Sequence, residues 1–289
     1  HWKKGVSRLS FPSRLNIMQE EIIDIIKSAL KEDMPKGDVT TDSLIEDGHQ
    51  SHAKFIAKES GIISGLEVAK EVFKQVGGSY KLEFNFKDGD YINKGDIIGV
   101  VDGDTKTILK AERLSLNIMQ RMSGIATNTH NFVSEIETET KILDTRKTTP
   151  NLRILERQAV RDGGGFNHRY SLSDMVLIKD NHIDAVGSIT KAVSLAKAKT
   201  NLTVEVEVET LEQFKEALAT GADIIMLDNM SNELMALCVK LNNKQKRLEA
   251  SGNMSLERVK SVAALGVDFI SVGSLTYASK ALDISLKFH

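Results

Sequence analysis

Cysteine and proline are scarce in this 289-residue chain, which has one Cys, at position 238, and three Pro. A single cysteine excludes an intrachain disulfide and a cysteine-rich zinc site, and it predicts a reducing, cytoplasmic compartment. Long apolar runs are also missing, and none approaches the roughly 18 residues of a transmembrane helix, so we expect no membrane partner. The formal charge is only −2, which excludes a strongly basic nucleic-acid binder.

The remaining composition is that of an ordinary globular protein, with 41% hydrophobic and 27% charged residues. The first 16 residues differ, because they carry four basic side chains and no acid. A transit peptide has this character, but the chain begins with His and the segment has no apolar core. We therefore interpret residues 1–17 as an extension or an expression remnant.

Residues 18–112 have the pattern of an α+β domain with antiparallel strands. Apolar residues recur at helical spacing in some segments and alternate in others, and Gly-Asp turns separate the later ones. The expected helices span 20–30 and 66–76, and the expected strands span 51–58, 80–86, 93–96 and 105–110.

Residues 113–289 follow a different pattern, in which strands and helices alternate. After a long helix over 112–137, apolar strand runs end near residues 143, 178, 208, 227, 250 and 272. Helices between these runs predict a parallel sheet with helices outside. Six strands and a candidate seventh favour an open, incomplete TIM-like α/β barrel over a doubly wound sheet. The alternation of valines and glutamates at 204–208 also favours the barrel, because the strands of a doubly wound sheet are covered on both faces and would be apolar on both.

Polar residues gather where the predicted strands end. The carboxyl ends of the strands carry the chemistry of α/β barrels, so six such clusters in register predict a ligand site. The clusters are Asp144-Thr145-Arg146-Lys147, Lys179-Asp180-Asn181-His182, Glu207, Asp228-Asn229, Ser251-Gly252-Asn253 and Gly273-Ser274.

The basic residues of these segments indicate an anionic ligand. The guanidinium forks of Arg146 and Arg169 suit carboxylate or phosphate groups, which they can bind in a bidentate manner. The ammonium groups of Lys147 and Lys179 suit single contacts with anions. His168 favours a hydrogen bond with an anion or with backbone over a metal, because it lacks a cysteine or helical histidine partner.

The other clusters extend this description of the ligand. Ser251-Gly252 and Gly273-Ser274 precede helices late in the barrel, where backbone N–H groups can bind a phosphate. Glu207 and Asp228 are negatively charged and would repel an anionic ligand, unless they bind ribose hydroxyls or Mg²⁺. We therefore predict a ligand that contains carboxylates, phosphates and a ribose.

The same segments resemble the quinolinate phosphoribosyltransferase family, from about residue 22 to the C-terminus. The matching motifs follow the family's order along the whole of this range. They include Gly37-Asp38-Val39-Thr40, Ala111-Glu112-Arg113, Asp144-Thr145-Arg146-Lys147-Thr148-Thr149-Pro150, Gly163-Gly164-Gly165-Phe166-Asn167-His168-Arg169, Leu177-Ile178-Lys179-Asp180-Asn181-His182, Leu227-Asp228-Asn229 and Glu249-Ala250-Ser251-Gly252.

The resemblance implies an α/β sandwich at 18–112 and an open, seven-stranded α/β barrel at 113–289, whose last residues pack back on the first domain. It also implies a homodimer with shared active sites, and in some members a higher oligomer. The implied reaction joins quinolinate to phosphoribosyl pyrophosphate (PRPP) with Mg²⁺, and it yields nicotinate mononucleotide, pyrophosphate and CO₂, a step of NAD biosynthesis.

The resemblance also assigns the site residues. Quinolinate is expected at Arg113, Arg146, His168, Arg169 and Lys179. PRPP is expected at Lys147, Asp180, His182, Glu207, Asp228, Ser251, Gly252, Gly273 and Ser274. Lys147, Glu207 and Asp228 are the expected catalytic residues, and the two acids are the expected Mg²⁺ ligands, directly or through water.

Departures from the family pattern leave an alternative open. Asn151, Arg157-Gln158 and Tyr170-Ser171 stand where the family usually has other residues. A related pyrophosphorylase-like phosphoribosyltransferase, acting on another pyridine or base, is the alternative. A non-enzymatic anion-binding barrel is a more distant one, because Glu207 and Asp228 would weaken pure anion binding.

Overall fold

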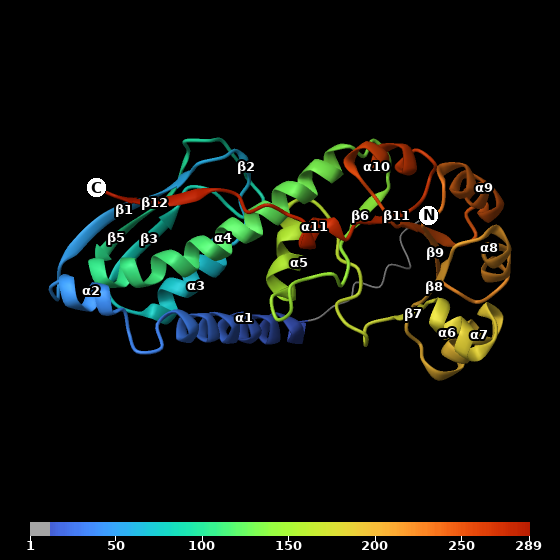
Figure 1. The fold of residues 1–289 in the computed structure, drawn as a ribbon, viewed down its shortest axis with the longest axis horizontal. Coiled ribbons are helices and arrows are strands. Elements are labelled where there is room, and N and C mark those ends of the chain that lie inside the picture. The colour runs from blue at the N-terminus through green and yellow to red at the C-terminus, as the bar shows by residue number, and fades with distance from the viewer. Residues whose placement is uncertain (1–11) are drawn as a thin grey trace. The chain divides into compact units, whose positions relative to one another are not determined.

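The computed structural model describes residues 12–289 and, in the first helix, side chains from Gln19 onward. The chain divides into two compact units (Figure 1). Unit 1 comprises the residues up to Ser123, Pro150–Gln158 and Ala281–His289, and unit 2 comprises Gly124–Thr149 and Ala159–Lys280. The two units meet after Ser123, whereas the predicted boundary lies at 112/113. Helix α4 (Thr105–Ser134) runs through both of these positions without a break.

Unit 1 is built on a four-stranded antiparallel sheet with the strand order β12-β1-β5-β3. Its strands are β1 (Gln50–Ala57), β3 (Tyr80–Phe84), β5 (Ile97–Asp104) and β12 (Ile284–Phe288). The C-terminal strand pairs with β1 in a register that places Ala53 opposite Phe288. The end of the chain is therefore part of the first unit's sheet.

Helices complete unit 1, together with a short pair of strands. The elements are α1 (Pro12–Asp33), α2 (Val39–Leu44), α3 (Leu66–Val76), the start of α4, and the paired strands β2 (Gly61–Ile62) and β4 (Tyr91–Ile92). Helix α1 begins within the predicted extension 1–17, and residues 1–11 of that extension lie outside the described part of the chain.

Two predicted strands of unit 1 are wrong. Residues 93–96 form a turn in which the Asp96 carboxylate accepts the Asn93 N–H at 2.8 Å. Residues 105–110 are the first turns of α4. The Asp104 carboxylate accepts the Thr107 N–H at 2.8 Å, so a helix cap overrides the β-branched residues that suggested a strand.

Unit 2 contains six parallel strands in the order β6-β11-β10-β9-β8-β7. They are β6 (Lys141–Leu143), β7 (Val176–Ile178), β8 (Val204–Val208), β9 (Ile224–Asp228), β10 (Arg247–Ser251) and β11 (Phe269–Ser271). Phe166 makes a single parallel bridge to Leu143 at the free edge of β6, where a seventh strand would lie. Within residues 12–289 the sheet does not close, which confirms an open, incomplete barrel.

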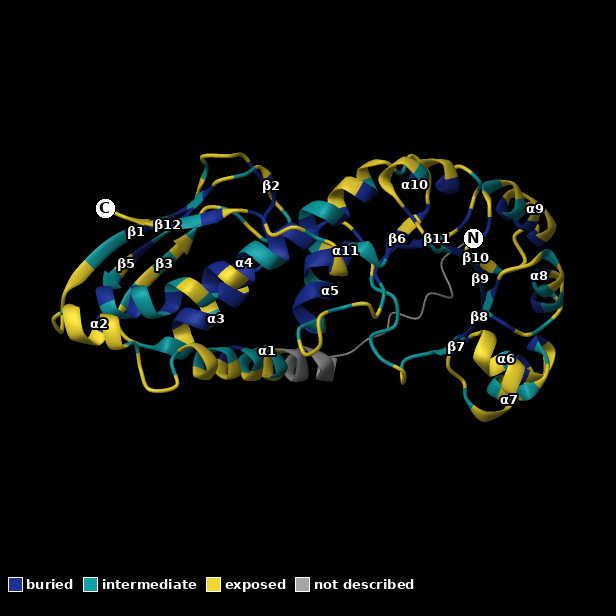
Figure 2. Cartoon of the chain, viewed as in Figure 1, coloured by how far each residue is buried: buried dark blue, intermediate teal, exposed yellow. Residues whose placement is uncertain are grey.

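Helices cover the outside of this sheet, and burial follows the layers (Figure 2). The helices are α6 (Asp180–Val186), α7 (Ile189–Lys199), α8 (Leu211–Leu218), α9 (Asn232–Asn242), α10 (Leu256–Ala263) and α11 (Ser274–Tyr277). Helix α5 (Arg153–Asp162) is divided between the two units. The valines of β8 are buried, as is Phe214 of α8. Alternation then turns Glu205 and Glu207 of β8 to the opposite, inner face.

No helix among the described residues combines the length and the apolar character needed to cross a membrane.

Candidate active site

The parallel strands of unit 2 bring the predicted site residues to one rim. Because the strands run in the same direction, their carboxyl ends share one edge of the sheet. Arg146 and Lys147 follow β6, Lys179 follows β7, Glu207 lies near the end of β8, and Asp228 ends β9. The remaining members follow in the same way. Asp180 and His182 lie in the first turn of α6, Ser251 ends β10, Gly252 follows it, and Gly273 and Ser274 follow β11.

Arg113 differs from the others, because it belongs to unit 1. It lies in α4, and its side chain is exposed.

Arg146 and Arg169 lie close enough for their charges to interact. Burial lowers the pKa of the half-buried Arg169, and the positive charge of Arg146 lowers it further. Two like charges that repel each other are held in one place, an arrangement that a bound dianion would stabilise. This geometry suits a ligand with two carboxylates.

Acidic groups form a second part of the rim. Carboxylate oxygens of Glu207, Glu209 and Asp228 lie within 4.8 Å of one another, and Lys179 Nζ lies 3.6 Å from Glu207 Oε2. Burial and the negative charge of Asp228 raise the pKa of Glu207, against the opposing effect of Lys179. A cluster of carboxylates fits Mg²⁺, which takes oxygen ligands and often completes its shell with phosphate.

The loops after β9 and β10 approach each other closely. Gly252 has φ +92°, and a Cβ added to it would lie 2.3 Å from Asn229 Oδ1, so the backbone there has no room for a side chain. Arg258 holds both loops, because its guanidinium donates to Gly252 O at 3.1 Å and to Met230 O at 2.6 Å. These bonds keep backbone groups of the predicted phosphate site in a fixed position.

Lys147 is anchored by its backbone, and its side chain is exposed. Thr276 Oγ1 donates to Lys147 O at 2.8 Å, and Lys147 N–H donates to Thr145 Oγ1 at 3.1 Å. A Cβ added at Gly273 would lie 3.0 Å from Lys147 Cδ, so the small residue leaves space for the lysine stem.

His182 has a capping role in addition to its predicted one. Its Nδ1 accepts the Lys179 N–H at 3.0 Å and so closes the first turn of α6. Its side chain is exposed at the rim.

A deeper layer lies beneath the rim and contains His168. Its Nε2 is 3.0 Å from Glu205 Oε2 and 3.0 Å from Glu249 Oε2, and both glutamates are almost fully buried. Its Nδ1 accepts the Arg169 N–H at 2.8 Å. Both ring nitrogens therefore face protein groups, and the prediction that His168 contacts quinolinate stays a prediction.

The proton balance of this cluster is set by opposing effects. Burial lowers the pKa of His168, but the two carboxyl groups outweigh it and raise the pKa to about 10. An Nδ1 that accepts the Arg169 N–H carries no proton, so this contact belongs to the neutral ring with its proton on Nε2, whereas the raised pKa favours the charged ring, in which Nδ1 is a donor. Burial and the charge of Glu249 raise the pKa of Glu205 to about 8, so Glu205 holds a proton at neutral pH.

Asp144 fixes the segment that carries His168. This carboxylate is fully buried, and its two oxygens accept the His168 N–H at 2.7 Å and Asn167 Nδ2–H at 2.6 Å. Arg161 in turn donates to Asn167 Oδ1 at 2.6 Å. The loop after α5 is therefore tied to the end of β6.

Several residues of the site were not predicted. Glu209 continues the alternation of Glu205 and Glu207, and this spacing is a signal that could have found it. Glu205 and Glu249 are charged residues inside apolar strand runs, which is also a signal. Arg258 gives no such signal, because its contacts with the backbone of Gly252 and Met230 depend on the path of two loops.

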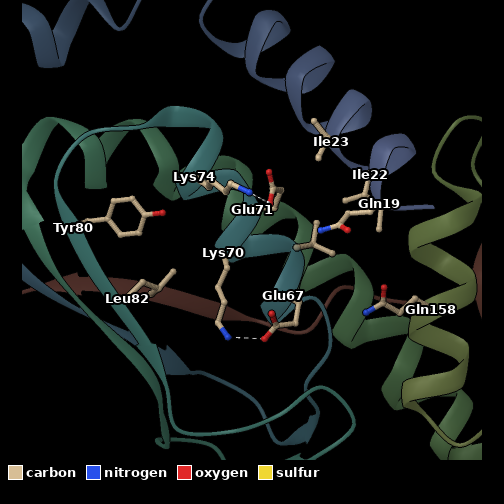
Figure 3. A pocket seen from close by; sticks show the side chains of 11 residues that line it. Gln19, Ile22, Ile23, Glu67, Lys70, Glu71, Lys74, Tyr80, Leu82 and Gln158 are labelled. Carbon is tan, nitrogen blue, oxygen red and sulfur yellow. Dashed lines mark hydrogen bonds and ion pairs between the residues drawn. The ribbon is translucent and has the colours of Figure 1, made fainter. Parts of the chain in front are cut away.

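The structure also describes cavities in unit 1. One of about 440 Å³ lies against α3 and is lined by Tyr80, Leu82 and a series of charged residues (Figure 3). Those charges pair along the helix, Lys70 with Glu67 at 2.6 Å and Lys74 with Glu71 at 3.6 Å. Paired neighbours of this kind are typical of a solvated helix face.

Comparison with known proteins identifies relatives for both units. Residues 38–123 match the family model described as quinolinate phosphoribosyl transferase, N-terminal domain, and residues 125–287 match that of the C-terminal domain. The chain is 44% identical over 259 residues to a probable nicotinate-nucleotide pyrophosphorylase [carboxylating] of Bacillus subtilis, covering 88% of this chain and 89% of the relative.

Two further comparisons agree with these matches. A chloroplastic nicotinate-nucleotide pyrophosphorylase [carboxylating] of Arabidopsis thaliana is 46% identical over 284 residues, covering 91% of this chain and 81% of the relative. The solved structure of the nicotinate-nucleotide pyrophosphorylase from Francisella tularensis superposes with a TM-score of 0.90 at 39% identity, covering 93% of this chain and 96% of that one.

Proposed function

The chain belongs to the quinolinate phosphoribosyltransferase family, and on this premise we propose that it joins quinolinate to PRPP. The products are nicotinate mononucleotide, pyrophosphate and CO₂. Two features carry this proposal: the charges of Arg146 and Arg169 lie close enough to interact, and the carboxylates of Glu207, Glu209 and Asp228 form a cluster at the barrel rim. Two cations match the two carboxylates of quinolinate, and the acids match a ribose.

The reaction needs positioned charges more than a strong base. The pyridine nitrogen of quinolinate has a free electron pair, so it can attack the ribose carbon without losing a proton. Carboxylates such as Glu207 and Asp228 would stabilise the positive charge that develops on the ribose, and Lys147 would neutralise the departing pyrophosphate. The bond between CO₂ and the ring then breaks, the positive ring nitrogen stabilises the electron pair left on the adjacent carbon, and that carbon takes up a proton from water to form the C–H bond of nicotinate mononucleotide.

Mg²⁺ is part of the proposal. The carboxylates of Glu207, Glu209 and Asp228 offer oxygen ligands within 4.8 Å of one another, and this donor set fits the ion. When bound with PRPP, Mg²⁺ would offset the negative charge of the pyrophosphate group. Its requirement is checked by activity measured across a Mg²⁺ titration after treatment with a chelator.

One assay separates the proposal from its alternatives. Purified protein is incubated with PRPP and Mg²⁺, together with quinolinate in one arm and nicotinate in the other. We expect nicotinate mononucleotide and CO₂ from quinolinate, and little product from nicotinate, which has one carboxylate. Product from nicotinate alone would favour the related phosphoribosyltransferase, and no product in either arm would favour a binding barrel.

We further propose a homodimer in which Arg113 of one subunit completes the quinolinate site of its partner. The supports are the family resemblance and the position of Arg113 on an exposed face of α4 in unit 1. Higher oligomers are compatible with this arrangement. We propose a cytoplasmic location, because a chain with a single cysteine suits a reducing compartment. Cell fractionation tests this location.

Mixing two inactive variants tests the shared site. Arg113→Ala and Lys147→Ala homodimers should both be nearly inactive. In a mixed dimer one site carries both defects and the other carries neither. Random pairing makes about half of the dimers mixed, so activity should recover to about a quarter of wild type. Subunit exchange confirmed by mass spectrometry without recovered activity would place Arg113 in the site of its own subunit.

A further inference from the structure

The ring of His168 links the buried layer of the barrel to the rim. On one side its Nε2 meets the two buried carboxyl groups of Glu205 and Glu249, each at 3.0 Å. On the other side its Nδ1 accepts the Arg169 N–H at 2.8 Å. The ring is thus a connection between two buried acids and the backbone of a predicted substrate residue.

Arg169 is held on its other side as well. The Asp174 carboxylate accepts the Tyr170 N–H at 2.5 Å and the Ser171 N–H at 3.3 Å, which forms a tight turn directly after Arg169. The repulsion between Arg146 and Arg169 acts to separate the two guanidinium groups. A rigid backbone on both sides of Arg169 resists that separation.

The burial of two acids in the barrel interior costs free energy, so a functional explanation for their presence is needed. Glu205 and Glu249 are 0% and 1% exposed, and a barrel interior made of apolar residues would avoid the cost of removing them from water. They come from β8 and β10, which are separated by β9, and a carboxylate oxygen of each lies 3.0 Å from Nε2. The contact with Glu249 is a hydrogen bond that fixes the ring, and the Glu205 carboxyl group packs against the same nitrogen without hydrogen-bond geometry.

We propose that Glu205 and Glu249 are positioning residues that, through the ring of His168, orient Arg169 for the carboxylates of quinolinate. The inference rests on the proposed function and deepens it, because it explains how one cationic group of the substrate site is kept in place. Neither glutamate is required to touch the substrate.

The first measurement is the affinity of the full-length protein for quinolinate and for PRPP, by calorimetry. Glu249→Gln and Glu205→Gln keep the size of the side chain and weaken the contact with His168. We expect Glu249→Gln to weaken quinolinate binding about tenfold or more, the range for a lost hydrogen bond to a charged group. Glu205→Gln resembles the protonated acid and should weaken quinolinate binding less, and both variants should leave PRPP binding unchanged. Glu156→Gln is the matched control, because Glu156 is equally buried and is paired with Arg121 in unit 1.

A double-mutant cycle then tests whether the glutamates act through Arg169. In an Arg169→Ala background, Glu249→Gln should cost no further quinolinate affinity, whereas in a Lys179→Ala background the two effects should add. If Glu249→Gln fails to fold, Glu205→Gln and His168→Gln enter the same cycle. Additive losses with Arg169→Ala would overturn the proposal.

The remaining outcomes are also decisive. Equal losses of quinolinate affinity in Glu249→Gln and in the Glu156→Gln control would indicate general destabilisation and overturn the proposal. Stoichiometric metal found by elemental analysis in wild type and lost in Glu249→Gln would make the cluster a metal centre instead. Absence of quinolinate binding to wild type would overturn the proposed function and this inference together, whereas wild-type binding with unchanged variants would overturn this inference alone.

Discussion

Two layers of the same barrel use the same residue type in different ways. Glu205 and Glu207 lie two residues apart in β8 and share its inner face, yet their side chains are 0% and 15% exposed. Glu205 faces His168 and Glu249 in the buried layer, whereas Glu207 lies at the rim with Asp228 and Lys179. Depth along one strand therefore separates the proposed positioning role of Glu205 from the proposed role of Glu207 at the ligand.

The two layers also differ in how their charges are balanced. In the buried layer the acids face a histidine, and the pKa of Glu205 rises until the group is neutral at pH 7. At the rim, like charges remain together, both among the acids and between Arg146 and Arg169. A bound ligand of opposite charge would stabilise like charges that lie close together, so the rim is the layer that suits a ligand.

Loss of stability should distinguish the layers most strongly. Glu249→Ala removes one partner of a buried ionic cluster and should lower the free energy of unfolding by about 3–5 kcal/mol. Glu207→Ala removes a partly exposed group and should cost about 1 kcal/mol or less. Urea unfolding of both variants measures the difference, and equal losses would contradict the division into layers.

The rim acids should affect turnover. Glu207→Gln and Asp228→Asn keep size and remove charge beside the ribose, so kcat should fall about 100- to 1000-fold, by analogy with the loss of other preorganised charges. Quinolinate affinity should be retained. Steady-state kinetics across a Mg²⁺ titration provides the measurement. Near wild-type turnover in both variants would make these groups structural carboxylates.

The rim arginines should affect quinolinate affinity. Arg146→Ala and Arg169→Ala each remove a charge-assisted contact, which should cost about 2–4 kcal/mol of quinolinate binding. PRPP affinity should change much less. Calorimetry with each ligand is the check, and unchanged quinolinate affinity in both variants would remove the assignment.

The smallest expected effect comes from two rim glycines. Gly252→Ala places a Cβ at φ +92° and 2.3 Å from Asn229 Oδ1, so stability should fall by about 1–3 kcal/mol and PRPP binding should weaken. Gly273 lies at an ordinary helical φ of −65°, and the flexible Lys147 stem is its nearest contact, so Gly273→Ala should cost less than Gly252→Ala. Thermal unfolding compares the two, and the reverse order would contradict this account.

The sequence predicted the barrel strands well and the first domain less well. Runs ending near 143 and 178 correspond to β6 and β7, which are apolar along their length or nearly so, and the run ending near 208 corresponds to β8, whose valines alternate with glutamates. The pattern of residues 105–110 wrongly predicts a strand, because β-branched side chains favour one, whereas the Asp104 cap that starts the helix depends on one side-chain contact. Helix ends are set by such local bonds.

The candidate site also has a part that the sequence predicts and a part that it does not. The class of ligand followed from the sequence, because Arg146, Lys147, Glu207 and Asp228 stand at the ends of predicted strands, and parallel strands bring these ends to one edge. Strand alternation also gave the face on which the glutamates of β8 lie. Those inferences need only the period of a strand and the direction of its neighbours.

Only the tertiary structure decided which polar groups meet. That His168 faces Glu205 and Glu249 depends on the depth of each residue in the barrel and on a loop that Asp144 fixes. These partners lie 24 to 81 positions from His168 along the chain and are separated from it by whole helices or strands. Period and composition carry no information on such distant contacts, because the register of neighbouring strands and the path of a loop are set by packing across the whole barrel.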